Sequence, residues 1–234
     1  MNTPGGAASS QSLAAGPSAE PVRIALGREA RLFGRRRYSQ ALSVLTEVLV
    51  RPDLTPRQRF EALCRKAECL ESLKRPREAV ELLKKVARSY PDEPLGFSLL
   101  GEYLYRIQDD SRGALKALRR ALKLSPKDPD TLWWTGQVLQ FGMGDLKRAG
   151  RLYRAALETS PRYAAAFDSL GSVCEAQGRW VEAIDWRKAH YRSTRQAHDL
   201  TALAELYLRL GNAAAALKYA RSAARREPGQ AAAW

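Results

Sequence analysis

Cysteine and histidine are scarce in this sequence, with three cysteines and two histidines among 234 residues. Cys64 and Cys69 do not have the spacing of a CxxC pair, and Cys174 is far from both along the chain. An odd number of cysteines without regular spacing is typical of a reducing compartment rather than of a disulfide framework. With so few thiols and imidazoles, we expect no metal site and no cofactor.

Long apolar stretches are also absent. The chain contains no uninterrupted apolar run of about 18 residues, the length that a membrane-spanning helix requires. Its N-terminal segment lacks the basic and apolar parts of a secretory signal. These absences predict an intracellular protein, located in the cytoplasm or the nucleus. The glycine, alanine, serine and proline content of residues 1–21 predicts a flexible tail, because little in it could offset the entropy of ordering.

Sequence motifs of common enzyme classes are missing as well. Gly142, Met143 and Gly144 look like part of a phosphate-binding loop but lack its Lys-Ser/Thr ending. A Gly-x-Ser-x-Gly motif does not occur, and His190 lies at an expected helix-packing position. Acid–base catalysis needs a converging pocket, which none of these residues provides. We therefore predict that the protein is not an enzyme.

A regular interval organises most of the chain. Gly101, Gly136 and Gly171 recur at a constant spacing. One alanine position occurs in six copies, at Ala41, Ala79, Ala114, Ala149, Ala183 and Ala216. Self-similarity with a period of about 34 residues predicts a stacked repeat array rather than a compact fold.

Each copy is predicted to form two amphipathic helices. In the fifth copy, apolar and small residues follow a helical period over 164–177 and again over 180–192. Gly178 permits a positive-φ turn between the two helices. Gly171 and Ala183 are expected where the paired helices approach most closely, because only small side chains allow that approach. Neighbouring pairs would then stack and bury a continuous core.

This pattern resembles the tetratricopeptide repeat family. In residues 129–161, the family's alternation of bulky residues with glycine, alanine and proline appears at Trp133, Gly136, Leu139, Gly144, Ala149, Tyr153, Ala156 and Pro161. The resemblance implies an all-α fold, a right-handed superhelical solenoid of stacked antiparallel helix pairs. It divides the chain into a tail, six repeats and the start of a seventh, incomplete repeat: residues 1–21; 22–58, 59–92, 93–127, 128–162, 163–196 and 197–229; and 230–234.

Two departures from the family pattern are expected to disturb the packing. The third and fourth repeats carry one extra residue between their helices, near Asp109–Asp110 and Phe141–Gly142, which should loosen those turns. The fifth repeat has Arg187 and His190 where the family favours an aromatic residue and an alanine. We therefore expect imperfect packing of the fifth repeat on the sixth.

Basic residues outnumber acidic ones by 39 to 25, for a formal net charge of +14. In the family, the first helix of each repeat lines the concave face. Groove positions carried over from the family are mostly acidic or neutral, namely Glu61, Cys64, Glu68, Glu102, Tyr105, Trp133, Gln137, Asp168, Ser172, Glu175, Thr201 and Glu205. The second helices carry the basic residues of the convex face, namely Lys84, Lys85, Arg88, Arg119, Arg120, Lys123, Arg151 and Arg154. We therefore expect an acidic-to-neutral groove on a solenoid with a basic back.

The resemblance implies a non-catalytic scaffold or adaptor that holds a neutral or basic segment of a protein partner in this groove, within a larger complex. At the positions where family members grip the carboxylates of chaperone tails, this chain has Leu26, Ala30, Cys64 and Glu68, so no such clamp is expected. Binding of RNA or another polyanion to the basic convex face is the alternative. A third possibility is self-association through the C-terminal end, because no polar capping helix follows there.

Overall fold

Helices build the whole described structure. In the computed structural model, which describes residues 20–226, the chain forms twelve α-helices and one π-helical segment, η1. The elements are α1 (Val22–Gly34), α2 (Tyr38–Leu49), α3 (Pro56–Ser72), α4 (Pro76–Ser89), α5 (Pro94–Gln108), α6 (Ser111–Leu124), α7 (Pro129–Gln137), η1 (Val138–Gly142), α8 (Leu146–Thr159), α9 (Ala164–Ala176), α10 (Trp180–Thr194), α11 (Ala197–Arg209) and α12 (Ala213–Arg226). Within residues 20–226, none of these helices has the length and apolarity needed to cross a membrane. The predicted all-α solenoid is confirmed, whereas most of the predicted tail and the predicted seventh repeat lie outside the described residues.

Local sequence signals explain where the helices begin. A proline occupies the first turn of α3, α4, α5 and α7, where its missing N–H breaks no helical hydrogen bond. Before α3, Thr55 forms a capping box with Gln58. The helix α3 begins at Pro56, three residues before the second repeat was expected to start, at about residue 59. Each of the other predicted ranges holds one helix pair, and we propose them as the repeat boundaries.

The turns within the repeats are ordered by hydrogen bonds. Gly178, between α9 and α10, has a φ of +71°, as the sequence predicted. In the third repeat, the extra residue is accommodated by Asp109, which adopts the left-handed conformation at φ 53°. In the fourth repeat, η1 replaces the last turn of the first helix, because a π-helix takes up one additional residue. Backbone bonds from Asp110 to Leu104 (3.0 Å) and from Asp145 to Leu139 (2.7 Å) close both turns, so neither is loosened.

Small residues let the helices of a pair approach closely. Ala183 is fully buried between α9 and α10, as predicted. Gly101 of α5 faces Leu118 of α6, and a Cβ atom on Gly101 would lie 2.5 Å from the Leu118 Cγ atom. Larger buried side chains from α3 to α9 fill the space around these contacts in one contiguous core. Consecutive helix pairs therefore share their apolar surface, as a repeat array requires.

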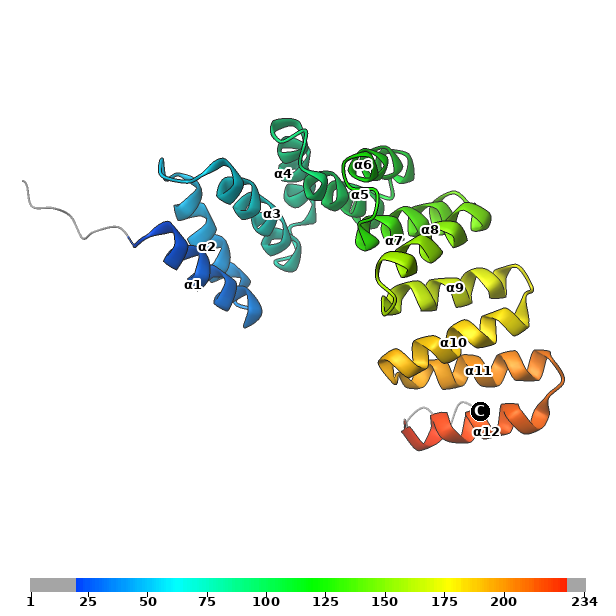
Figure 1. Ribbon diagram of the computed structural model, residues 1–234. Helices are drawn as coiled ribbons and strands as arrows, with labels where there is room; N and C mark the ends of the chain where they lie inside the picture. Colours follow the sequence, from blue (N-terminus) through cyan, green and yellow to red (C-terminus); the bar gives the residue numbers. More distant parts are fainter. Residues whose placement is uncertain (1–19, 227–234) are drawn as a thin grey trace, which may run out of the picture.

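The helix pairs follow one another around an arch, with α1–α4 in one arm and α9–α12 in the other (Figure 1). The first helices of the central pairs touch directly, α5 against α7 and α7 against α9. We call the side of the arch formed by the first helix of each pair the inner face. The second helices form the outer face, where α6 and α8 diverge and leave a hollow between them.

Candidate functional site

The inner face carries most of the predicted groove residues at or near its surface. Of the twelve, Glu61 and Glu205 are exposed and nine are half-buried. Cys64 is a correction, because it is only 3% exposed and packs against Phe60 and Val86 in the core. A thiol behaves as a small apolar group, and burial raises the pKa of Cys64 to about 12. Cys64 is therefore a core residue and not a groove residue.

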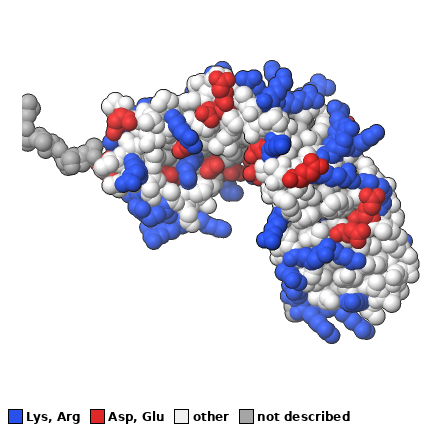
Figure 2. Space-filling model, in the orientation of Figure 1, with Lys and Arg blue, Asp and Glu red and all other residues white. Residues whose placement is uncertain are grey.

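Glutamates gather where α3 and α5 meet on the inner face. Arg106 donates hydrogen bonds to Glu102 (2.6 Å) and, across the repeat boundary, to Glu71 (2.8 Å). Burial raises the pKa of Glu68 and of Glu102, and in both cases neighbouring glutamates raise it further against the opposing effect of a nearby arginine. Figure 2 shows acidic side chains in the bend of the arch, whereas basic side chains lie along the inner edges of both arms. Because burial penalises these carboxylates, a bound cationic group would stabilise their charged form.

Polar side chains join the fourth repeat to the fifth along the middle of the inner face. The indole N–H of Trp133 donates to the Ser169 hydroxyl at 2.9 Å, and the Gln137 amide donates to the same hydroxyl at 3.0 Å. The amide of Gln140 donates to Ser172 at 3.1 Å. The predicted residues Trp133, Gln137 and Ser172 therefore lie in one polar row whose hydrogen bonds already link two repeats.

Arg187 and His190 of α10 are both well paired, Arg187 within the fifth repeat and His190 across its joint with the sixth. Arg187 is 9% exposed; its Nε donates to Glu175 at 2.7 Å, and its guanidinium also bonds Asp168. His190 is 6% exposed, and its Nδ1 lies 2.8 Å from a carboxylate oxygen of the fully buried Asp199. The expectation of imperfect packing at Arg187 and His190 is therefore wrong, because carboxylates from neighbouring helices satisfy both side chains.

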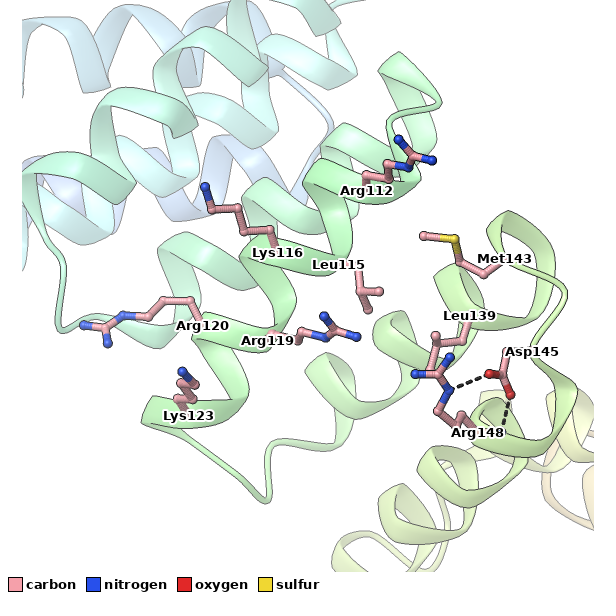
Figure 3. Close-up of a pocket in the computed structure, with 10 residues that line it drawn as sticks. All are labelled: Arg112, Leu115, Lys116, Arg119, Arg120, Lys123, Leu139, Met143, Asp145 and Arg148. Carbon is pink, nitrogen blue, oxygen red and sulfur yellow. Dashed lines mark hydrogen bonds and ion pairs between the residues drawn. The ribbon is translucent and has the colours of Figure 1, made fainter.

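Basic side chains line the hollow between α6 and α8 on the outer face (Figure 3). Its volume is about 790 Å³, and Leu115, Leu139 and Met143 give it apolar walls. Arg119 of α6 and Arg148 of α8 reach toward each other across it, and Arg148 is paired with Asp145. The charged lining residues are Arg112, Lys116, Arg119, Arg120, Lys123, Asp145 and Arg148. Six cationic groups against one carboxylate make this hollow strongly positive.

The remaining predicted basic residues are spread over the outer face. Lys85 and Arg88 of α4 are exposed, and Lys84 of the same helix pairs with Glu81. Arg151 and Arg154 line a second hollow, of about 450 Å³, beside the end of α9. The sequence also placed Arg148 among the basic residues of the second helices, but it did not single out Arg112 and Lys116, although these share one helical face with Arg119 and Lys123 through their spacing. Figure 2 shows the resulting basic patches along the outer edge of the arch.

Comparison with known proteins agrees with the repeat pattern. A family model described as tetratricopeptide repeat matches residues 30–94 and 139–198. Among curated human proteins, protein O-mannosyl-transferase TMTC1 is 27% identical over 171 residues, and aspartyl/asparaginyl beta-hydroxylase is 26% identical over 179 residues. The matches cover 70% and 71% of this chain but 18% and 23% of those proteins. The chain therefore spans about a fifth of the length of these curated relatives.

Solved structures show the same fold. PilW, described as a type IV pilus biogenesis factor, superposes with a TM-score of 0.77 at 20% identity, covering 88% of this chain and 94% of PilW. PilF of Pseudomonas aeruginosa gives 0.73 at 19% identity, covering 89% and 90%. A chain of the APC/C hetero-tetramer Cut9–Hcn1 gives 0.74 at 19% identity, covering 90% of this chain and 41% of that one. At these identities the likeness concerns the fold and does not extend to function.

Proposed function

Because the chain belongs to the tetratricopeptide repeat family, we propose that it is a non-catalytic scaffold that holds a segment of a protein partner against its inner face. Because the curved groove is already formed, the repeat protein loses little conformational entropy when it binds an extended segment. Two structural relatives favour this role: YrrB is described as having an unusual peptide-binding site, and Cut9 is part of a hetero-tetramer. The enzyme names of the two human relatives belong to much longer proteins.

The chemistry of the groove favours a basic or neutral segment. Glu68, Glu71 and Glu102 lie together, and Arg106 bridges Glu71 and Glu102. A lysine or arginine of the partner would relieve the cost of burying the Glu68 carboxylate. The half-buried rings of Tyr105 and Trp133 offer apolar contact nearby, and aromatic side chains contribute much of the binding energy at interfaces. The same glutamates argue against an acidic chaperone tail as the ligand.

A synthetic peptide tests this proposal. We expect a fluorescently labelled peptide of alternating lysine and leucine to bind the full chain by anisotropy, and its glutamate–leucine counterpart not to bind. Glu68→Lys should weaken binding about tenfold or more, because it removes a carboxylate and adds repulsion. Glu158→Lys is the matched control, since it makes the same charge change at an exposed position of α8. Equal losses in the two variants, or tighter binding of the acidic peptide, would contradict the proposal.

The basic hollow between α6 and α8 supports a second candidate function, the binding of a polyanion such as RNA. A single-stranded oligonucleotide should then bind with an affinity that falls steeply with salt, because phosphate contacts release counterions. Arg119→Ser combined with Arg148→Ser should weaken binding, whereas Arg221→Ser on α12 should have a smaller effect. An affinity that does not change with salt, or that is insensitive to the double substitution, would exclude this hollow as the site.

A further inference from the structure

Four potential metal ligands meet at the joint of α9, α10 and α11. They are Asp168 of α9, His190 of α10, and His198 and Asp199 of α11. One nitrogen or oxygen atom from each lies within 4.8 Å of all the others. The cluster contains both histidines of the chain, brought together from different helices of two successive repeats.

The spacing of the four groups approaches that of a tetrahedral ion site. Zinc–nitrogen and zinc–oxygen bonds of about 2.1 Å place neighbouring ligand atoms about 3.4 Å apart in a tetrahedron. Here Asp199 Oδ1 lies 2.8 Å from His190 Nδ1 and 3.5 Å from His198 Nε2. His198 Nε2 lies 3.9 Å from Asp168 Oδ1. All four ligand atoms lie within 4.8 Å of one another, so side-chain rotations that move them by about 1.4 Å or less would convert this cluster into a closed ligand set.

The surrounding charge also favours a dication. Glu175, Asp168 and Asp199 bring three carboxylates to the joint, while Arg187 brings one guanidinium, bonded to Glu175 and Asp168. With neutral imidazoles, which is the form that binds metals, the joint has an excess of two negative charges. Asp168 Oδ1, which lies 3.9 Å from His198 Nε2, also accepts the bond from Arg187, so an ion would share this carboxylate with the guanidinium unless Asp168 rotates to offer its second oxygen.

Two residues of the cluster are buried, which makes it rigid, and the other two are partly exposed, which gives an ion a path to it. Asp199 is fully buried and His190 is nearly so, which limits their freedom before an ion arrives. The side chain of His198 is 53% exposed and that of Asp168 is 45% exposed, so the cluster opens to solvent on the inner face. An ion entering there takes the place of the proton between His190 Nδ1 and Asp199; the neutral imidazole then carries its one proton on Nε2, so no net proton is released.

We propose that Asp168, His190, His198 and Asp199 form a structural site for Zn²⁺ that fastens the sixth repeat to the fifth. Two imidazoles with two carboxylates suit zinc, whereas calcium and magnesium prefer ligand sets made only of oxygen. Four protein ligands fill the tetrahedral coordination of zinc, which is characteristic of structural rather than catalytic sites. The ion joins α9, α10 and α11 and thereby stabilises the C-terminal arm of the arch.

Cobalt substitution tests the site directly. The full chain without an affinity tag, treated with chelator and then titrated with Co²⁺, should develop the visible absorption of tetrahedral cobalt with one equivalent bound. Zn²⁺ should displace the cobalt and raise the melting temperature of the protein. His198→Asn should weaken metal binding by about 100-fold or more, because it removes a ligand. Asp185→Asn, at an exposed position of α10, is the control and should bind as the parent chain does.

His198→Asn is the informative variant for two reasons. The His198 side chain is half-exposed, and removing the imidazole leaves the buried His190–Asp199 pair in place. Its melting temperature without metal should equal that of the parent chain, which separates a ligand role from a packing role. Absence of the cobalt absorption in the parent chain would overturn the proposal. Equal metal affinities of the parent chain and His198→Asn would do so too.

Discussion

Gly136 of α7 lies against the ring of Tyr153 of α8, so closely that a Cβ atom on Gly136 would lie 2.4 Å from Tyr153 Cε1. Tyr153 is fully buried, and its hydroxyl donates to Gln140 at 2.9 Å, so the ring has no free space to retreat into. The pair explains why glycine recurs at this helix position in copies that place a large side chain opposite it.

Gly136→Ala should therefore destabilise the protein. Overpacking of a filled core costs about 1–3 kcal/mol, which exceeds the small gain in helix propensity from glycine to alanine. Urea unfolding followed by circular dichroism measures the loss. Gly150→Ala in α8 is the control, because its Cβ atom would make an ordinary contact, 3.5 Å from Val173 Cγ1. That variant should be neutral or more stable, and a similar loss in both would refute the packing argument.

Glu29 of α1 is a buried carboxylate, and its cost to stability can be tested. It is 1% exposed, its Oε1 has no hydrogen-bond partner among the described residues, and Arg65 lies 3.7 Å from its other oxygen. Burial raises the pKa of Glu29 above its usual value of 4.5. Between the usual and the raised pKa, the folded chain holds a proton that the unfolded chain has lost, so the free energy of unfolding falls as pH rises.

Glu29→Gln removes this effect and should raise the free energy of unfolding at pH about 7 by about 1 kcal/mol. The advantage over the parent chain should shrink toward pH about 4, where both states carry the proton. Unfolding curves at the two pH values measure it. Glu61→Gln, on the exposed surface of α3, should change neither curve. An equal advantage at both pH values would show that the carboxylate charge is not the cause.

Arg187 tests the buried ion pairs between α9 and α10 within the fifth repeat. Its side chain is 11% exposed and makes bonds to two carboxylates, a fork that lysine cannot reproduce. Arg187→Lys should lower the free energy of unfolding by about 2 kcal/mol. Arg106→Lys is the matched control, because Arg106 also bridges two carboxylates but is 40% exposed. Exposed ion pairs contribute about 0–1 kcal/mol, so equal losses would contradict the importance of burial.

The cysteines should be unreactive in the folded chain. Burial raises the pKa of Cys64 and Cys69 to about 12, and it raises the pKa of Cys174 as well. At pH about 8, roughly one Cys64 thiol in ten thousand is then the reactive thiolate. A thiol reagent such as DTNB should react slowly with the folded chain and rapidly with all three cysteines in urea. Fast labelling of any cysteine before unfolding would contradict the burial of that residue.

The sequence was sufficient to predict the helix pairs, the turn at Gly178 and the close approach at Ala183. Each follows from residues a few positions apart, and such short-range patterns are governed by helix geometry. It was insufficient for Cys64, which occupies a groove position in the family pattern but faces Phe60 and Val86. The rotation of α3 about its axis decides that, and it depends on how α3 packs against α4.

The charge pattern divides in the same way. Helical spacing alone places Arg112, Lys116 and Arg119 on one face of α6, but only the divergence of α6 from α8 sets Arg148 opposite them. Arg187 and His190 looked like packing defects in the sequence because their partners come from neighbouring helices. Helical periodicity depends on residues a few positions apart, so it can be recognised from the sequence alone. The distances that decide whether a buried charge is paired arise only when separate helices pack against each other, because electrostatic energy depends on separation in space and not along the chain.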